Sequence, residues 1–342
     1  MIPPVILNEV KDLAKRILRF TRSLVPSLLG MTLGIVLLFF PLIVIAQQVS
    51  LSISPPIIEA VMKPGKSIMI AYTLKNNGDP VIINSKIVNF EPSDNFGNIK
   101  LGLEATGPVR FSLDNADLQL GQAFFLETGK SQQLLLRIRI PDRAPNGDYY
   151  YSLLAQTERG EILEGVTSSG ARATIASNIL ITVTDSGIID VQPRIARFDI
   201  LSKIKIFDSF DKIPVVLYVE NRGNNLIKPE GQINLRGIFG GAAEYDIIPK
   251  NILSRSQRLV EATPSANLTA KAEDLGPTSL VLSGFFVGKY NLTTNISFGE
   301  NSPTVFESAS FFAFPFKIAI GLIITVAATV FITRKYSSKE ED

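Results

Sequence analysis

The chain has 342 residues, a formal net charge of +2, and no histidine, cysteine or tryptophan. The missing cysteines exclude disulfides and cysteine-type zinc sites, and the missing histidines exclude Ser-His-Asp catalysis and imidazole metal ligands. We therefore expect no enzyme, no catalytic or metal-binding residues and no cofactor. Residues 47–316 hold 25 basic and 27 acidic side chains, a balance that argues against the clustered basic face of a nucleic-acid-binding protein.

The first element in chain order is an uncharged stretch of 23 residues, 24–46, which follows five lysine and arginine side chains. It is long enough to cross a bilayer, and the basic residues before it stay in the cytoplasm, so the chain emerges outside. Residues 1–46 are therefore either a signal peptide or a retained signal anchor, and the length of the stretch supports the anchor. A small-residue site at Ala46 favours cleavage, which we predict between Ala46 and Gln47.

The residues that follow show the two-residue periodicity of β-strands. In "SIMIAYTLKN" (67–76) and "QQLLLRIRIP" (132–141), apolar side chains alternate with polar ones, which is typical of an antiparallel sheet with one buried face. Turn sequences such as "KPGK", "NNGDP" and "APNGDY" separate the strands, and no amphipathic helix of three turns is evident between 47 and 310. Short strands at this spacing predict an all-β fold of the sandwich type.

The same region contains a weak internal repeat. A strand that ends in Asn-Asn-Gly (76–78) has a counterpart that ends in Glu-Asn-Arg-Gly (220–223), and each half later has Gly-x-Tyr at the start of a strand. This order predicts two copies of one immunoglobulin-like unit. Tyr149 and Tyr290 are the candidates for a tyrosine corner, in which the hydroxyl bonds back to the backbone a few residues upstream.

The C-terminal end predicts a second membrane segment. Sixteen uncharged residues, 318–333, follow the aromatic stretch "FFAFPF", and their length and basic flanks are typical of a retained transmembrane helix. We predict this helix at residues 311–333 and a cytoplasmic tail at 334–342. The predicted boundary residues are Lys317 on the outer side, and Arg334 and Lys335 on the cytoplasmic side.

Together these elements predict an all-β body between two membrane-targeting segments. Two tandem immunoglobulin-like β-sandwich domains occupy residues 47–187 and 188–310, flanked by the N-terminal signal or transmembrane helix and the C-terminal transmembrane helix. The protein is then a single-pass membrane protein with its domains outside the cell. A cysteine-free domain outside the cytoplasm is common in many bacteria, so we expect a bacterial source.

The opening of the body resembles a known family. The stretch "SPPIIEAVMKPGKSIMIAYTLKNNG", with Pro64-Gly65 and Asn76 to Gly78, and the later Gly147-Asp148-Tyr149 are similar to short motifs of bacterial WxL-interacting surface proteins. The resemblance implies a signal peptide, two tandem immunoglobulin-like domains, one C-terminal helix and a short basic tail. It further implies that the first domain associates with peptidoglycan and the second with a host or partner protein.

Two functions are consistent with this organisation. The first is a membrane-anchored cell-surface binding or adhesion protein, whose domains engage cell-wall polymer or a surface protein through sheet edges and loops. The alternative is a structural subunit of a surface complex, with the domains as spacers and the helix as the interaction surface. The helix holds Gly321, Ala327 and Ala328 but no clean repeat of small residues every four positions, which argues mildly against the alternative.

Overall fold

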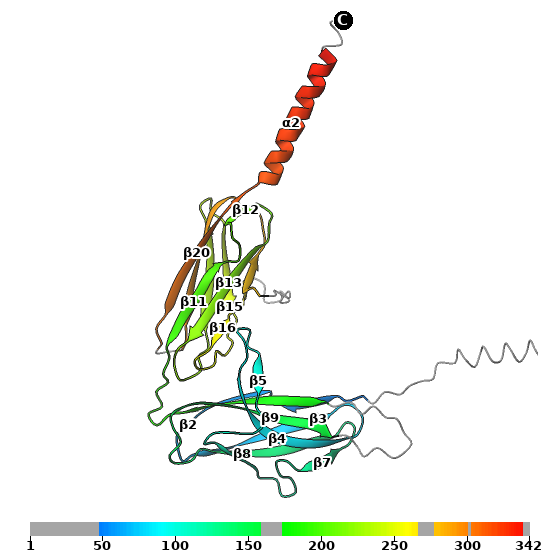
Figure 1. The fold of residues 1–342 in the computed structure, drawn as a ribbon, viewed down its shortest axis with the longest axis vertical. Coiled ribbons are helices and arrows are strands. Elements are labelled where there is room, and N and C mark those ends of the chain that lie inside the picture. Colours follow the sequence, from blue (N-terminus) through cyan, green and yellow to red (C-terminus); the bar gives the residue numbers. More distant parts are fainter. Residues whose placement is uncertain (1–47, 159–172, 266–276, 300–301, 338–342) are drawn as a thin grey trace, which may run out of the picture. The chain divides into compact units, whose positions relative to one another are not determined.

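Figure 1 shows the fold in a computed structural model, which describes residues 48–158, 173–265, 277–299 and 302–337. The predicted N-terminal segment, with its cleavage site at Ala46 and Gln47, lies outside these residues. Val49–Asp342 form one compact unit. The described residues of this unit form strands β1 to β20 and the helix α2, so the all-β character of the body is confirmed.

A first pair of sheets is built from residues 51–183 and encloses a single core. Its strands are β1 (Leu51–Ser54), β2 (Ile57–Met62), β3 (Ser67–Asn76), β4 (Val81–Pro92), β5 (Ile99–Leu101), β6 (Arg110–Leu113), β7 (Ala123–Leu126), β8 (Ser131–Arg139), β9 (Gly147–Glu158) and β10 (Thr174–Val183). One sheet has the order β1-β3-β8-β6, and the other has β2-β10-β9-β4-β5 with β7 on β4. We call this the first sheet pair.

The alternation of apolar residues forms the core of the first sheet pair. β3 and β8 are antiparallel, with Tyr72 opposite Leu134, and both side chains are 0% exposed. Leu136 and Ile138 continue the same face and are fully buried, while Arg137 between them is exposed. The predicted inward and outward faces of these two strands are therefore confirmed. Burying one apolar face of each sheet against the other is what stabilises such a pair.

A second sheet pair, residues 193–314, encloses a separate core. Its strands are β11 (Pro193–Ile200), β12 (Ile206–Asp208), β13 (Ile213–Asn221), β14 (Glu230–Gly237), β15 (Ala242–Ile247), β16 (Gln257–Leu259), β17 (Ala262–Pro264), β18 (Leu280–Leu282), β19 (Gly288–Ser297) and β20 (Val305–Phe314). One sheet has the order β11-β13-β16 with β18 on β13, and the other has β12-β20-β19-β14-β15-β17.

The internal repeat has a physical counterpart in two buried asparagines. Asn76 ends β3 and Asn221 ends β13, and they are 0% and 1% exposed. In each, the side-chain oxygen accepts a hydrogen bond at 3.0 Å from the backbone N–H two residues on, at Gly78 and at Gly223. The Asn-x-Gly sequence in each half is therefore a turn whose polar side chain is buried and bonded.

The helix α2 (Phe316–Ser337) begins later than predicted. Residues 311–314 form the end of β20, so the second sheet pair extends to residue 314, and the prediction of a helix over 311–333 is wrong at its start. The stretch "FFAFPF" alternates, with Phe311 and Ala313 buried and Phe312 and Phe314 exposed. Hydrophobicity alone predicts a membrane segment for this stretch. The alternation of buried and exposed residues has the period of two that marks a strand.

Candidate functional site

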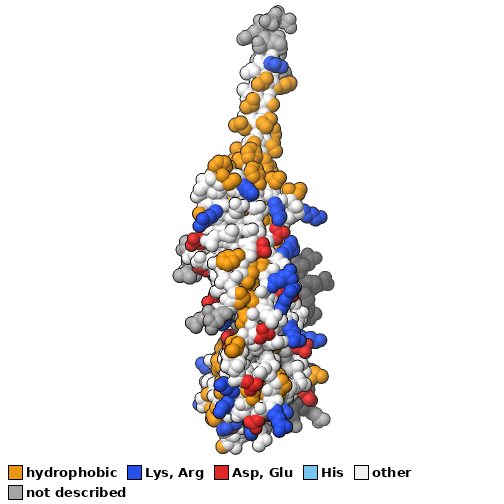
Figure 2. Space-filling model, turned by 90° about the vertical axis from the view of Figure 1, so that its left-hand side faces the viewer, with side chains coloured by type: hydrophobic (Ala, Val, Ile, Leu, Met, Phe, Trp, Pro, Cys, Tyr) orange, Lys and Arg blue, Asp and Glu red, His pale blue; other side chains and the backbone are white. Residues whose placement is uncertain are grey.

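Helix α2 is uncharged and mostly apolar between Lys317 and Arg334. Its 22 residues span about 33 Å at about 1.5 Å per residue, which is close to the ~30 Å of bilayer hydrocarbon. Phe316–Arg334 have a mean hydropathy of 2.2 and none of this window is buried against the rest of the chain. Figure 2 shows hydrophobic side chains along the face of the helix in view. Among the described residues, it is the one helix long and apolar enough to cross a membrane.

The threonines of α2 are satisfied within the helix. The Thr325 hydroxyl donates to the Gly321 carbonyl and the Thr329 hydroxyl to the Thr325 carbonyl, both at 2.9 Å. In hydrocarbon a hydroxyl has no water to bond, so these internal bonds lower the cost of placing it there. They also show that small residues do recur every four positions at 321, 325 and 329, a repeat that was missed because the threonines were not counted.

Two aspartates fasten the start of α2 to the second sheet pair. β12 pairs with β20 so that Asp208 lies opposite Phe314, and its side chain is 1% exposed. Its Oδ2 accepts the Lys317 backbone N–H at 3.0 Å, and a carboxylate there complements the positive end of the helix dipole. The Lys317 Nζ donates to Asp211 Oδ1 at 2.6 Å. Lys317, predicted as an outer boundary residue, therefore forms an ion pair at the helix junction.

This junction has a defined pH dependence. The hydrogen bond from Lys317 holds the pKa of Asp211 below its ordinary value of 3.8. A carboxyl with a lowered pKa stabilises the fold at any pH above its ordinary value, and that contribution disappears as the pH falls through the lowered one. The junction is therefore fully formed at neutral pH.

We expect Asp208→Ala to loosen the first turn of α2. The Lys317 amide loses its only acceptor from the sheet pair, which costs about 1 kcal/mol in comparable helix caps. In detergent, hydrogen exchange of the amide at residue 317 should rise about fivefold. Asp211→Ala is the matched control, because its half-buried side chain bonds the Lys317 ammonium and the backbone amide of Asp208, not the Lys317 amide. Equal exchange in wild type and Asp208→Ala would contradict the capping role.

A second polar cluster connects the two sheet pairs through Asp148. Its Oδ1 accepts hydrogen bonds from the Thr182 hydroxyl at 2.7 Å and from Asn225 Nδ2 at 2.9 Å. Its Oδ2 accepts from the Tyr150 hydroxyl at 2.7 Å and from the backbone N–H of Leu226. Two donors belong to the first sheet pair and two to the β13–β14 loop of the second. One carboxylate thus bonds both sheet pairs, and bonds to a charged group are among the stronger ones.

Tyr150 extends this contact into an apolar one. Its hydroxyl accepts the backbone N–H of Ser254 at 2.9 Å, and its ring stacks on Phe90 with centroids 5.7 Å apart. Phe90 and Leu180 of the first sheet pair form a small core with Leu253 of the second. Burial, followed by the charge of Asp148, raises the pKa of Tyr150 far above its ordinary range, so the hydroxyl stays protonated and can donate to Asp148.

A small cavity lies beside this contact. It measures about 100 Å³ and its lining includes Phe90, Asp94, Leu253 and Arg258. The Arg258 Nη1 donates to the Asn251 carbonyl at 2.7 Å, and burial lowers the pKa of the guanidinium. Pockets for small-molecule ligands measure about 300–1,000 Å³, so this cavity has room for a few water molecules only. Among the described residues, no three acidic side chains are grouped so that they could hold a metal ion.

The structure places the two predicted tyrosines differently. The Tyr149 hydroxyl donates to the Pro145 carbonyl, four residues upstream, at 2.9 Å. Tyr290 is 7% exposed, and its ring stacks on Phe311 with centroids 5.2 Å apart. Arg334 is exposed near the end of α2, and the side chain of Lys335 lies outside the described part. The sequence analysis missed Asp148 and Tyr150, although both belong to the "GDYYY" stretch that contains Tyr149.

Comparisons with known proteins give a fold resemblance only. No protein family model matches this chain, and no curated protein matches it. The class 5 fimbriae chaperone CfaA is 12% identical over 76% of this chain and 99% of its own, with a TM-score of 0.35. The E. coli chaperone DraB is 12% identical over 77% and 97%, with a TM-score of 0.35. A family 123 glycoside hydrolase from Clostridium perfringens is 13% identical over 40% and 28%, with a TM-score of 0.28. Similarities this low carry no argument about function.

Proposed function

We propose that this chain is a membrane-anchored cell-surface binding protein, in which α2 displays two tandem immunoglobulin-like domains outside the cell. The observation that supports it is the exposed apolar surface of α2. Such a surface is unfavourable in water and becomes favourable when the helix lies in the hydrocarbon of a bilayer. The two separate cores support the two-domain division. The chain is not an enzyme in this proposal, because its composition lacks the usual general base and metal ligands.

The proposed orientation follows from charge. Arg334 and Lys335 stand at the C-terminal end of α2 and stay in the cytoplasm under the positive-inside rule. The basic residues before residue 24 stay there as well, so the two sheet pairs between these segments face outward. Cleavage between Ala46 and Gln47 then leaves α2 as the only anchor.

The proposed binding surface is a sheet edge of the first sheet pair. β2 ends its sheet and is paired only with β10, and its Ile57 and Val61 side chains are 44% and 58% exposed. An exposed edge can accept a strand from a partner through main-chain hydrogen bonds. A protein partner fits this edge directly, whereas the resemblance to WxL-interacting surface proteins supports cell-wall polymer as the ligand of the same domain.

One observation favours the alternative function of a structural spacer. The Asp148 cluster bonds the two sheet pairs to each other, and the Asp208 bond fastens the second pair to α2. Such connections suit a protein that holds another component at a fixed distance from the membrane. The binding experiment below separates the two functions.

The experiment tests location first and binding second. Protease added to intact cells should remove the sheet pairs and spare an epitope tag placed after Asp342. The full chain, purified in detergent, is then mixed with protein-free cell walls and, separately, with solubilised surface proteins. Saturable retention supports the binding function, and Val61→Lys, which charges the β2 edge, should abolish binding to a protein partner. Phe306→Lys is the matched control, because Phe306 on β20 is also a well-exposed hydrophobic side chain, at 67% against 58% for Val61.

The outcomes distinguish the proposals. A tag that is cleaved on intact cells would contradict the orientation. A chain that binds neither walls nor any surface protein, but is lost from a membrane complex when α2 is scrambled, would replace the binding function by the spacer function.

A further inference from the structure

The end of the second sheet pair next to α2 exposes an unusual number of large hydrophobic side chains. It consists of residues 201–212, 238–241, 283–287 and 312–316, which we call the membrane-proximal rim. Its most exposed members range from 44% to 77% exposed. They are Ile204, Ile206, Phe210, Ile238, Phe239, Phe285, Phe312 and Phe314.

The strand register places the segments of the rim in one row. Phe312 of β20 lies opposite Ile206 of β12 on one side and Lys289 of β19 on the other. The backbone N–H of Ile238 donates to the Lys289 carbonyl at 3.1 Å, which brings the β14–β15 turn to the same edge. These segments, far apart in sequence, therefore meet where the chain enters α2.

The opposite end of the same sheet pair differs. In the described residues of its loops, 222–229, 248–256 and 298–304, no large hydrophobic side chain is exposed, and beside them only Phe306, Ile188 and Ile189 are. Figure 2 shows hydrophobic side chains gathered on the second sheet pair at the base of α2. Scattered exposed hydrophobics are normal, but a cluster confined to one end indicates a contact with an apolar phase or a partner.

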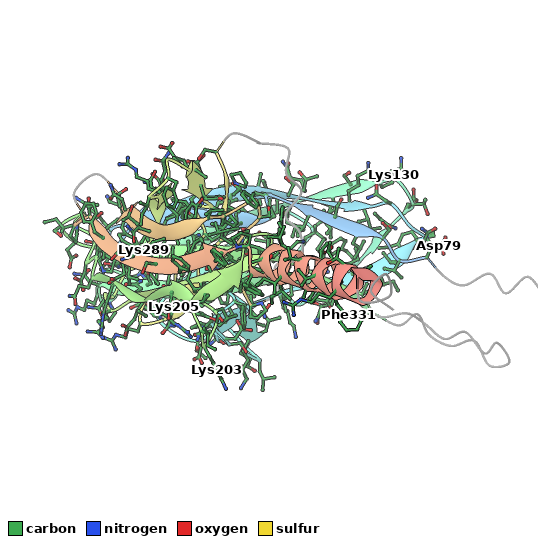
Figure 3. All side chains as sticks on the ribbon, turned by 90° about the horizontal axis from the view of Figure 1, so that it is seen from above. Asp79, Lys130, Lys203, Lys205, Lys289 and Phe331 are labelled. Carbon is green, nitrogen blue, oxygen red and sulfur yellow. The ribbon has the colours of Figure 1, made fainter. Side chains whose placement is uncertain are left out.

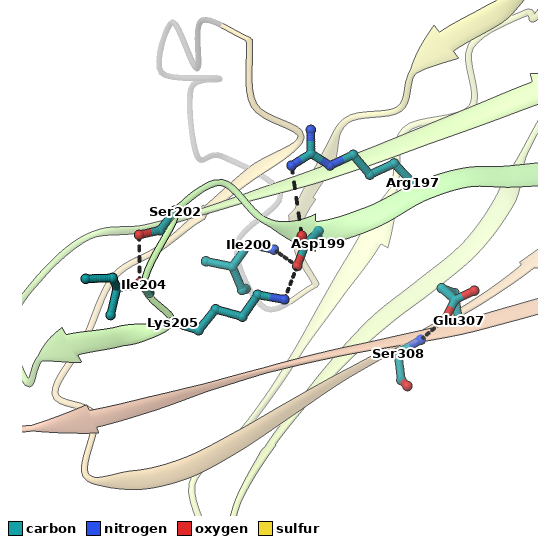
Figure 4. A network of polar contacts seen from close by, with 8 residues as sticks. All are labelled: Arg197, Asp199, Ile200, Ser202, Ile204, Lys205, Glu307 and Ser308. Atoms are coloured by element: carbon teal, nitrogen blue, oxygen red, sulfur yellow. Dashed lines mark hydrogen bonds and ion pairs between the residues drawn. The ribbon is translucent and has the colours of Figure 1, made fainter.

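The rim is held in shape by polar contacts, as Figure 4 shows for the loop between β11 and β12. The Lys205 ammonium donates to Asp199 Oδ1 at 2.6 Å, and the Ser202 hydroxyl donates to the Ile204 carbonyl at 2.7 Å. Across the rim, the rings of Phe210 and Phe285 are 5.0 Å apart. These hydrogen bonds and this ring contact therefore hold the exposed hydrophobic side chains of the rim in place.

The charge of the rim complements an anionic surface. The rim and the strand ends beside it (199–212, 236–241, 283–289 and 312–317) contain six lysine and arginine residues and three aspartates, with no glutamate. Each aspartate already has a lysine within 4.0 Å in the rim. Lys203 and Lys289 are exposed (Figure 3), and lysines near a bilayer are attracted by anionic headgroups.

We infer that the membrane-proximal rim lies in the headgroup layer of an anionic bilayer, with its phenylalanines and isoleucines at the edge of the hydrocarbon and its lysines on lipid phosphates. Only Pro315 separates β20 from α2, so the β20 end of the rim lies within about 8 Å of the first residue of the helix. This inference rests on the proposed anchoring by α2. It makes the second sheet pair a peripheral lipid-binding module as well as a linker.

Single tryptophans test the inference, because the chain has none of its own. The full chain is reconstituted in phosphatidylcholine vesicles, with or without phosphatidylglycerol, that contain phospholipid brominated near the headgroup end of the acyl chain. Phe239→Trp should lose about half of its fluorescence to the bromine, since interfacial groups insert about 5–10 Å. Phe306→Trp, an exposed site at the other end of the same sheet, should lose none. Phe331→Trp within α2 reports insertion of the helix.

The outcomes separate the inference from the proposed anchoring. Quenching at 331 with none at 239 overturns the lipid contact and leaves the anchor intact. A blue-shifted but unquenched tryptophan at 239 would also overturn it, and would assign the rim to a contact with a second copy of this chain. No quenching at 331 overturns the anchor itself. Lys203→Glu with Lys289→Glu should reduce quenching at 239 in anionic vesicles to its level in phosphatidylcholine, and unchanged quenching would refute the role of the lysines.

Discussion

Asp148→Ala should loosen the contact between the two sheet pairs while leaving each core folded. The variant removes four acceptor interactions at once and leaves partly buried donors from Tyr150, Asn225 and Leu226 without this partner. Hydrogen bonds to a charged group contribute about 1.5–3 kcal/mol each, and unsatisfied donors add to the loss, so we expect the contact to weaken by about 3–5 kcal/mol. The Lys228–Glu59 ion pair, the bond from Asn251 to Glu59 and the bond from the Leu259 N–H to the Asn95 carbonyl remain between the two pairs, so the contact loosens without being lost.

The absence of native cysteine allows a direct measurement. Spin labels on cysteines introduced at the exposed positions Thr73 on β3 and Asn291 on β19 report the distance between the sheet pairs. The distribution should be narrow in the parent chain and broad in Asp148→Ala. Asp117→Ala, which removes an exposed carboxylate from the first sheet pair, is the control and should leave it narrow. An equally narrow distribution in Asp148→Ala would show that the carboxylate does not hold the pairs together.

Tyr150→Phe separates the contribution of the Tyr150 hydroxyl to the contact from the contribution of its ring. It keeps the ring stacked on Phe90 and removes only the hydroxyl, which donates to Asp148 and accepts from Ser254. If both residues act in one cluster, the double variant should cost less than the sum of the two single variants, because the shared bond is lost once. Additive effects would mean that the two residues act independently.

The two-residue periodicity of the sequence correctly predicted the strands and the side chains that they bury. Strict alternation placed Tyr72, Leu134 and Leu136 in the core, and the structure confirms their burial. The role of Asp148 could not be predicted, since its donors at 225 and 226 are 77 and 78 residues away and period two says which face a residue occupies but not what packs against it. The start of α2 was misplaced because hydrophobic content alone does not separate an aromatic strand end from a helix.

The sequence shows the Asn-x-Gly turn only as a weak internal repeat. The hydrogen bonds of Asn221 show how this turn stabilises the second sheet pair. Asn221 is 1% exposed, and its Nδ2 donates to the carbonyls of Asn225, Ile252 and Leu253 at 2.8–3.2 Å. With two hydrogens and three acceptors, at least one bond is shared. One amide therefore joins the end of β13 to the loops before β14 and β16.

Asn221→Ala should destabilise the second sheet pair strongly. Removing the amide leaves the Asn225 carbonyl and the Gly223 N–H without their partner, whereas the Ile252 and Leu253 carbonyls keep the Ile227 N–H and the Ser256 hydroxyl. Two unsatisfied groups at about 1–3 kcal/mol each lead us to expect a loss of about 3 kcal/mol. Amides of β13 and β19 should then exchange about a hundredfold faster, whereas those of β3 and β8, in the separate first core, should be unchanged.

The neighbouring residue provides the control for this prediction. Asn224 is exposed and in the same loop, so Asn224→Ala removes the same chemical group without leaving buried carbonyls unbonded. It should leave hydrogen exchange in β13 nearly unchanged.

Asn76→Ala should have the corresponding effect in the first sheet pair, with faster exchange in β3 and β8 only, because Asn76 makes the equivalent bonds to Gly78 and to the Leu126 carbonyl. If either buried asparagine can be replaced without cost, the turn is not the shared structural element of the two halves. If each destabilises only its own half, the two cores unfold separately, although the Asp148 cluster and the Glu59 contacts bond them to each other.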